Sequence, residues 1–270
     1  MKHRAGQMVR RWRGQVRDVV DRVGPRHSEQ RVIAEAAQYW STPAAHAWRG
    51  NSHWRDGIPG QWERVGDDHL ALFGKLARVL DRAPSMGTVV EWGSGGGANA
   101  VAFAPGADRF VAVDVARASL EECERRTRAV CDTPFQPVLI EVEHPEQAVE
   151  HIGRGTCDVF LCLYVIELLP SRDYARRVLD IARELLGPSG VMFVQIKYRD
   201  NADRSPHKRN YARNLASQTI FPIDTFWQIA TAHGFTPEVV SLVPRNDLDR
   251  NYAYLLLTRS PNGEDIARST

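Results

Sequence analysis

From residue 88 onward, short apolar runs typical of buried strands alternate with segments of helical pattern. The predicted strands cover residues 88–92, 109–114, 137–142, 157–163 and 191–197. Helices are expected between them, beginning near Gly97, Ala116, Pro145 and Arg172. Because strands that alternate with helices are joined by crossovers, the pattern predicts an α/β fold, with a parallel sheet that has helices on both faces.

The two ends of the chain follow different patterns. After a helix expected over 222–233, the runs "TPEVVSLVP" and "NYAYLLLTR" predict two more strands with a short loop between them, and so an antiparallel edge. At the other end, helical patterns over 6–25, 28–38 and 67–81 surround an aromatic stretch, 39–62. We therefore expect three parts: a helical and aromatic N-terminal extension or cap (1–66), a main domain (67–260) with a lid insertion (198–219), and a tail (261–270).

The composition is that of an ordinary globular chain. Of its 270 residues 43% are hydrophobic and 25% are charged, and the net charge is only +2. No apolar stretch approaches the roughly 20 residues of a membrane helix, and no apolar segment typical of a secretory signal follows the basic start. The four cysteines form neither a CxxC pair nor a zinc spacing, which favours reduced thiols and predicts a cytoplasmic protein.

The run "VVEWGSGGGANAVAF" (89–103) takes an apolar strand into a glycine-rich turn. Gly93, Gly95 and Ala98 fit the G-x-G-x-x-G/A spacing of dinucleotide-binding proteins. Glu91, followed by glycines at 93, 95 and 97, equally fits the acidic turn of enzymes that bind S-adenosylmethionine (SAM). The turn therefore predicts an adenosine cofactor without choosing between the two.

Two acidic residues near this turn bear on the choice of cofactor. Asp114 ends the second predicted strand, where a carboxylate can accept hydrogen bonds from both ribose hydroxyls of either cofactor. Glu91 would repel a pyrophosphate but attract an ammonium group such as that of the methionine end of SAM. This charge argument favours SAM.

Over about residues 60–260 the sequence resembles the class I SAM-dependent methyltransferases, in particular bacterial small-molecule enzymes. The resemblance rests on ordered blocks: "VVEWGSGGG", "FVAVDVARASLEECERR", "VLIEVEHPEQA", "CDVFLCLYVIELLPS" and "VLDIARELLGPSGVMFVQIK". It implies a Rossmann-like, mostly parallel seven-stranded sheet with an antiparallel last strand. It also implies that SAM is bound by Glu91, Gly93, Ser94, Gly95, Gly97, Asp114, Val115, Glu143 and Leu163. Glu143 stands where the family more often has Asp.

The resemblance implies methyl transfer to an oxygen or nitrogen of a small molecule, because the motifs of other subclasses are missing. The chain has no Asn/Asp-Pro-Pro-aromatic motif after its fourth strand, no Pro-Cys dipeptide, and only Glu167 where protein-arginine enzymes have two glutamates. No metal site is expected, because an acid-rich helix start explains Asp67-Asp68-His69. Two alternatives stay open: a non-catalytic partner or regulatory protein of the same fold, and a transferase of another group.

The acceptor site is expected outside the sheet. The tentative catalytic residues are His53, His207 and Tyr164. Either histidine could act as the base for a hydroxyl acceptor, and Tyr164 is expected to lie near the methyl group that is transferred. The basic insertion "KYRDNADRSPHKRNYARN" suggests an anionic or polyhydroxylated acceptor, and a solvated loop explains it equally well.

The basic first helix is expected to pack on the domain or in a homodimer, and no nucleic-acid partner is expected. The arginine-rich composition suggests a bacterial natural-product biosynthetic enzyme.

Overall fold

The computed structural model describes the central part of the chain. The described residues are 27–41, 61–80, 85–198, 211–212, 215, 218–242 and 251–260, with no side chains described for 61–63. The first predicted helix, most of the aromatic stretch and most of the insertion lie outside this part. Among the described residues, no helix is long and apolar enough to cross a membrane.

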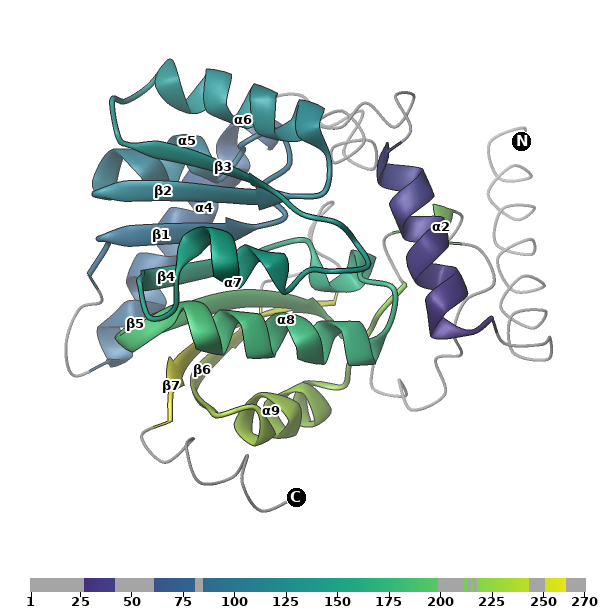
Figure 1. Cartoon of the computed structure of the whole chain (residues 1–270). Helices are drawn as coiled ribbons and strands as arrows, with labels where there is room; N and C mark the ends of the chain where they lie inside the picture. The colour runs from purple at the N-terminus through teal and green to yellow at the C-terminus, as the bar shows by residue number, and fades with distance from the viewer. Residues whose placement is uncertain are drawn as a thin grey trace, which may run out of the picture.

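The described strands form one seven-stranded sheet (Figure 1). They are β1 (Thr88–Trp92), β2 (Arg109–Asp114), β3 (Phe135–Leu139), β4 (Cys157–Cys162), β5 (Leu186–Lys197), β6 (Phe235–Leu242) and β7 (Tyr252–Arg259). Their order is β3-β2-β1-β4-β5-β7-β6, and β7 runs antiparallel to both β5 and β6. The predicted mostly parallel sheet with an antiparallel last strand is confirmed.

Helices cover both faces of this sheet, as predicted. One hydrophobic core contains side chains of α4 (Gln61–Leu76), α5 (Ala100–Phe103) and α6 (Arg117–Arg128). The other contains side chains of α7 (Gln147–Ile152), α8 (Arg172–Leu185) and α9 (Ile223–Ala232). Alternate strand residues point into each core because successive side chains of a strand face opposite ways.

Four predicted boundaries are wrong. The strand expected over 191–197 is β5, which already begins at Leu186. The helix expected near Gly97 begins at Ala100, because Gly93, Gly95 and Gly97 have positive φ angles of 70°, 52° and 79°, which a right-handed helix excludes. The strand expected over 137–142 is β3, which ends at Leu139. The helix expected from residue 67 begins at Gln61, so the acidic residues 67 and 68 lie inside α4 rather than at its start.

Helix α2 (Glu29–Ser41) belongs to the predicted N-terminal extension, and it lies beyond the ends of the parallel strands in Figure 1. Its residues Val32 and Ala36 are buried in the core on the α8 face. The helix therefore packs against the main sheet domain.

Candidate active site

A cleft lies at the carboxyl ends of the parallel strands. Strand β1 has β2 on one side and β4 on the other, and ligands of open α/β sheets bind where the strand order reverses in this way. The cleft holds about 1030 Å³ of empty space, including its open mouth. Eight of the residues predicted from the sequence line it: Glu91, Gly93, Ser94, Gly95, Asp114, Val115, Leu163 and Tyr164.

The glycine turn forms the floor of this cleft. The backbone N–H groups of Gly93 and Ser94 both donate to the carbonyl oxygen of Val113, at 2.8 and 3.1 Å, which ties the turn to β2. A Cβ at Gly93 would lie 2.5 Å from Val165 Cγ2, and the positive φ there disfavours any other residue.

Gly97 has a different role from the other glycines of the turn. It does not line the cleft, and a Cβ there would lie 2.9 Å from the Cα atom of Cys123 on α6. Gly97 thus allows the turn to pack closely against α6, and the structure gives it no contact with the cleft.

Asp114 stabilises the same turn through its carboxylate. Oδ2 accepts a hydrogen bond from the backbone N–H of Gly95 at 2.8 Å, and Oδ1 accepts one from Ala116 at 2.9 Å. Burial raises the pKa of Asp114 to about 6, although these backbone hydrogen bonds act to lower it. Each oxygen keeps a second lone pair with which a ligand hydroxyl can bond.

Glu91 is a buried carboxylate with only one of its oxygens bonded. Oε1 accepts a hydrogen bond from Asn99 Nδ2 at 2.8 Å, whereas Oε2 is buried with no hydrogen-bond partner. Burial raises the pKa of Glu91 to about 8, the Asn99 hydrogen bond lowers it and the nearby Asp114 adds to the rise. A buried carboxylate of this kind at a cleft favours a cationic ligand group, because a positive charge would stabilise its ionised form.

Tyr164 lies at the end of β4 in an unusual backbone conformation. Its φ is +58°, and its backbone N–H donates to Gln195 Oε1 at 2.6 Å. Such conformations in bulky residues are uncommon and tend to occur at functional sites. The side chain lines the cleft beside Glu91 and Gly93, so the structure brings the tentative residue Tyr164 together with the predicted cofactor residues.

The wall opposite the glycine turn is aromatic and was not predicted in detail. Trp40 of α2 donates its indole N–H to Tyr211 Oη at 2.8 Å, and Tyr211 donates to the carbonyl oxygen of Leu168 at 2.7 Å. Both aromatic side chains line the cleft, together with Leu215 of the insertion. The wall agrees with the expectation that the acceptor site lies outside the sheet, but no spacing in the sequence indicates that Trp40 bonds to Tyr211.

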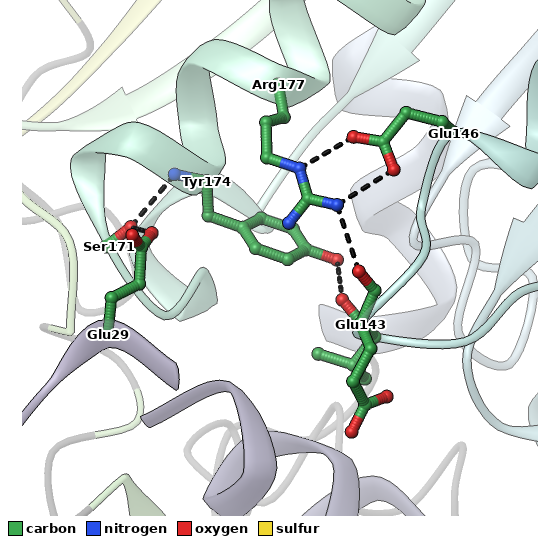
Figure 2. A network of polar contacts seen from close by, with 7 residues as sticks. Glu29, Glu143, Glu146, Ser171, Tyr174 and Arg177 are labelled. Carbon is green, nitrogen blue, oxygen red and sulfur yellow. Dashed lines mark hydrogen bonds and ion pairs between the residues drawn. The ribbon is translucent and has the colours of Figure 1, made fainter. Parts of the chain in front are cut away.

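Glu143 does not line the cleft, although it was a candidate for cofactor binding. Its side chain is exposed, and its backbone carbonyl accepts a hydrogen bond from Arg177 Nη2 at 2.9 Å (Figure 2). Ile140 and Val142 line the cleft instead. Residues 138, 140 and 142 are buried and residues 139, 141 and 143 are exposed, so the alternation of β3 continues past its end and turns Glu143 outward.

A polar network on α8 holds this segment in place (Figure 2). Tyr174 Oη donates to the carbonyl oxygen of Val142 at 2.8 Å, and the Arg177 guanidinium forms an ion pair with Glu146. Ser171, whose hydroxyl caps α8, also bonds to Glu29 of α2. The network therefore connects α2, α8 and the segment after β3 around one side of the cleft.

The remaining candidates, His53 and His207, lie outside the described residues. No group of His, Cys, Asp or Glu suitable for a metal ion occurs in the part of the chain that the structure describes. His69, which the sequence placed only in an acid-rich helix start, is 3% exposed and bonded to Asn99 and Tyr254. These partners lie 30 and 185 residues away in the sequence, so no local pattern indicated them.

Comparison with known proteins agrees with this geometry. Residues 90–192 match a family model described as "Methyltransferase domain". No curated protein matches the sequence.

Three solved structures resemble the fold at low sequence identity. The 1,6-didemethyltoxoflavin-N1-methyltransferase of Burkholderia thailandensis has a TM-score of 0.63 and 18% identity, over 88% of this chain and 92% of that one. A SAM-dependent methyltransferase of Leishmania major has a TM-score of 0.58 and 13% identity, over 88% of each chain. The N-methyltransferase NodS of Bradyrhizobium japonicum has a TM-score of 0.53 and 13% identity, over 73% and 99%. With its glycine turn and sheet order, the chain contains a methyltransferase domain with the class I fold.

Proposed function

We propose that the protein transfers the methyl group of SAM to an oxygen or nitrogen of a small molecule, in a bacterial biosynthetic route. The observation that carries the proposal is the buried Glu91 Oε2, which has no partner at the floor of a cleft that also contains the glycine turn and Asp114. An ammonium group next to Glu91 and a ribose next to Asp114 would satisfy both carboxylates with one ligand.

The proposed cofactor contacts follow from the chemistry of each position. Glu91 binds the ammonium of the methionine end, and Asp114 accepts hydrogen bonds from the ribose hydroxyls. The backbone at Gly93 and Gly95 approaches the ligand closely because glycine has no side chain, and Ser94 lies between them on the cleft. Val115 and Leu163 contribute apolar contacts, supported by the neighbouring Ile140 and Val142. Gly97 and Glu143 are assigned no cofactor contact.

The acceptor would lie between Tyr164 and the aromatic wall. Among the described residues that line the cleft, only Glu91 and Asp114 carry charge. An acceptor with an apolar or planar part suits the wall formed by Trp40, Tyr211 and Leu168. Any anionic or hydroxylated part would then face the basic insertion, 198–219, as the sequence suggested. The 1,6-didemethyltoxoflavin-N1-methyltransferase, whose structure contains bound 1,6-didemethyltoxoflavin, is one fold neighbour consistent with this proposal.

We assign the binding of the acceptor to the two segments outside the sheet. Residues 1–66 act as a cap and 198–219 as a lid, and the bond between Trp40 and Tyr211 joins one to the other. Excluding water in this way favours methyl transfer, since the chemistry depends chiefly on alignment of the acceptor atom.

Isothermal titration calorimetry with S-adenosylhomocysteine (SAH) and with NAD tests the cofactor assignment. We expect micromolar-range binding of SAH and no measurable binding of NAD. Binding of NAD without SAH would overturn the proposal. Transfer of radiolabel from methyl-labelled SAM to a panel of aromatic hydroxyl and amine compounds then separates an enzyme from a non-catalytic SAM-fold protein.

A further inference from the structure

A chain of polar side chains connects Tyr164 at the cleft with Glu91 at its floor. Tyr254 Oη lies 3.3 Å from Tyr164 Oη and 3.2 Å from His69 Nε2. His69 Nδ1 lies 2.7 Å from Asn99 Oδ1, and Asn99 Nδ2 donates to Glu91 Oε1 at 2.8 Å. Five residues from α4, β1, β7 and two loops thus form one continuous hydrogen-bonded path.

The path runs from the cleft into the interior. Tyr164 is partly exposed and lines the cleft, whereas Tyr254 and His69 are 1% and 3% exposed. The rings are packed together, with centroids 5.3 Å apart for His69 and Tyr164 and 5.6 Å apart for His69 and Tyr254. His69 is therefore reached from the cleft through the two tyrosines.

Glu91 determines which nitrogen of His69 carries the proton. Glu91 Oε1 accepts from Asn99 Nδ2, so Asn99 presents its NH₂ group to Glu91 and its oxygen to His69. His69 Nδ1 must then donate to that oxygen, which leaves Nε2 with a lone pair. This nitrogen faces the hydroxyl of Tyr254.

Gln195 favours the same direction of hydrogen bonding. Its Nε2 donates to Tyr254 Oη at 3.0 Å, while its Oε1 accepts from the backbone N–H of Tyr164. Since Tyr254 accepts from Gln195, its single hydroxyl proton is donated either to Tyr164 Oη, as in the structure at 3.3 Å, or, once the hydroxyl rotates, to His69 Nε2 at 3.2 Å. Gln195 thus fixes both the tyrosine hydroxyl and the backbone of Tyr164.

We propose that His69 takes up the proton of a hydroxyl-bearing methyl acceptor, relayed through Tyr164 and Tyr254. The inference rests on the proposed function. As the acceptor oxygen bonds to the methyl carbon and the carbon–sulfur bond breaks, its proton passes to the Tyr164 oxygen. The proton of Tyr164 passes to Tyr254, and that of Tyr254 passes to His69 Nε2. The electron pair of the broken bond stays on sulfur, and the positive charge moves from the sulfonium to the imidazolium.

The charge that forms on His69 is stabilised within the same path. Its Nδ1–H remains bonded to Asn99, which is in turn bonded to Glu91. After the product leaves, the proton returns to the cleft along the tyrosines. In this scheme Tyr164 contacts the acceptor, and His69 and Tyr254 act through it.

The tautomer of His69 can be measured without knowing the acceptor. The measurement uses NMR of the full-length protein, labelled with ¹⁵N-histidine and saturated with SAH. The imidazole nitrogen resonances that disappear in His69→Gln are those of His69. We expect a neutral imidazole protonated at Nδ1. In Tyr254→Phe the Nε2 resonance should move downfield, because the hydrogen bond to that nitrogen is lost. The matched control Tyr252→Phe, which removes a neighbouring hydroxyl bonded to Glu167, should leave it unchanged.

Two results would overturn the relay: a His69 protonated at Nε2, or an Nε2 resonance that does not respond to Tyr254→Phe. If His69→Gln does not fold, nuclear Overhauser contacts to the rings of Tyr164 and Tyr254 identify the resonance instead. Absence of SAH binding would count against the proposed function, and the tautomer would then be measured in the ligand-free protein. With any hydroxyl compound that the protein methylates, Tyr254→Phe should lower kcat at least about tenfold and leave SAH affinity unchanged.

Discussion

At the scale of single residues, two buried carboxylates dominate the cleft, and they differ in how well their charge is stabilised. Asp114 accepts two backbone hydrogen bonds, whereas Glu91 has one bonded oxygen and one with no partner. The pKa of Glu91 is accordingly raised further, to about 8, than that of Asp114, which is raised to about 6. Glu91 is therefore largely protonated near neutral pH until a cation binds.

Binding of SAH near pH 7 should release a proton, because its ammonium group converts Glu91 to the carboxylate. Calorimetry in buffers with different ionisation enthalpies measures this release. In Glu91→Gln, which cannot ionise, we expect the release to disappear and the affinity to fall at least about tenfold, since a charged hydrogen bond is lost. A heat of binding that is the same in every buffer for the wild-type protein would contradict the assignment.

The stability of the ligand-free protein should fall as pH rises from about 4.5 to 8. In this window the folded protein holds a proton on Glu91 that the unfolded chain, with its pKa of 4.5, has lost. Raising the pH therefore favours unfolding, and the stabilisation by the proton is complete only below pH 4.5. Urea unfolding at several pH values checks this slope, which should be shallower in Glu91→Gln and in the SAH complex.

Replacing Asp114 by Ala should weaken SAH binding by about 1.5–3 kcal/mol, because the ligand and the turn both lose hydrogen bonds. The matched control is Asp158→Ala. Asp158 Oδ2 also accepts a backbone hydrogen bond, from Thr88 at 2.8 Å, but at the opposite end of β1. The control should lose stability and keep its SAH affinity by calorimetry. Equal affinities of the two variants would show that Asp114 only stabilises the turn.

At the scale of elements, the turn between β1 and α5 and the helix α2 form the two sides of the cleft. The turn depends on glycines for two different reasons. Gly93 and Gly95 line the cleft, while Gly97 allows α6 to approach. Helix α2 is joined to Tyr211 through the hydrogen bond of Trp40 and to Ser171, which caps α8, through that of Glu29.

Gly97→Ala should destabilise the protein by about 2–4 kcal/mol, since it combines an unfavourable positive φ with a clash against Cys123. Thermal unfolding measures the loss. Gly106→Ala is the matched control, because a Cβ there meets nothing within 4 Å. The control should differ from the wild-type protein by at most about 0.5 kcal/mol. Near-normal stability of Gly97→Ala would contradict the packing role.

At the scale of the whole molecule, ligand binding and folding are coupled, because the cleft is formed by β1, β2, β4, α2 and part of the insertion. A ligand that binds only the folded state stabilises it, by about 2.7 kcal/mol at a concentration 100 times its Kd. SAH at this concentration should raise Tm by roughly 5–10 °C, given about 2–4 °C per kcal/mol for a domain of this size. NAD at the same concentration should leave Tm unchanged. An equal rise with NAD would contradict the choice of cofactor.

The fold class and the position of the cofactor cleft could be predicted from the sequence because both depend on local patterns. Alternating apolar and helical runs predict a parallel sheet, and its strand ends bring the glycine turn and Asp114 together. The prediction of the site was incomplete where the site depends on contacts between segments that are distant in the sequence. Trp40 and Tyr211 are 171 residues apart, and His69 and Tyr254 are 185 apart, so no spacing indicates either pair.

The sequence by itself determined which backbone could bind an adenosine cofactor, because glycine spacing and strand-end acids act over a few residues. Only the tertiary structure decided which side chains face the cleft. His69 became buried because α4 packs it against Asn99 and Tyr254, which lie far from it in the sequence. Glu143 faces outward because the alternation of β3 continues past Leu139. The raised pKa of Glu91 also belongs to the tertiary structure. It arises from desolvation, and desolvation exists only once strands, helices and loops from the whole chain have closed around the carboxylate.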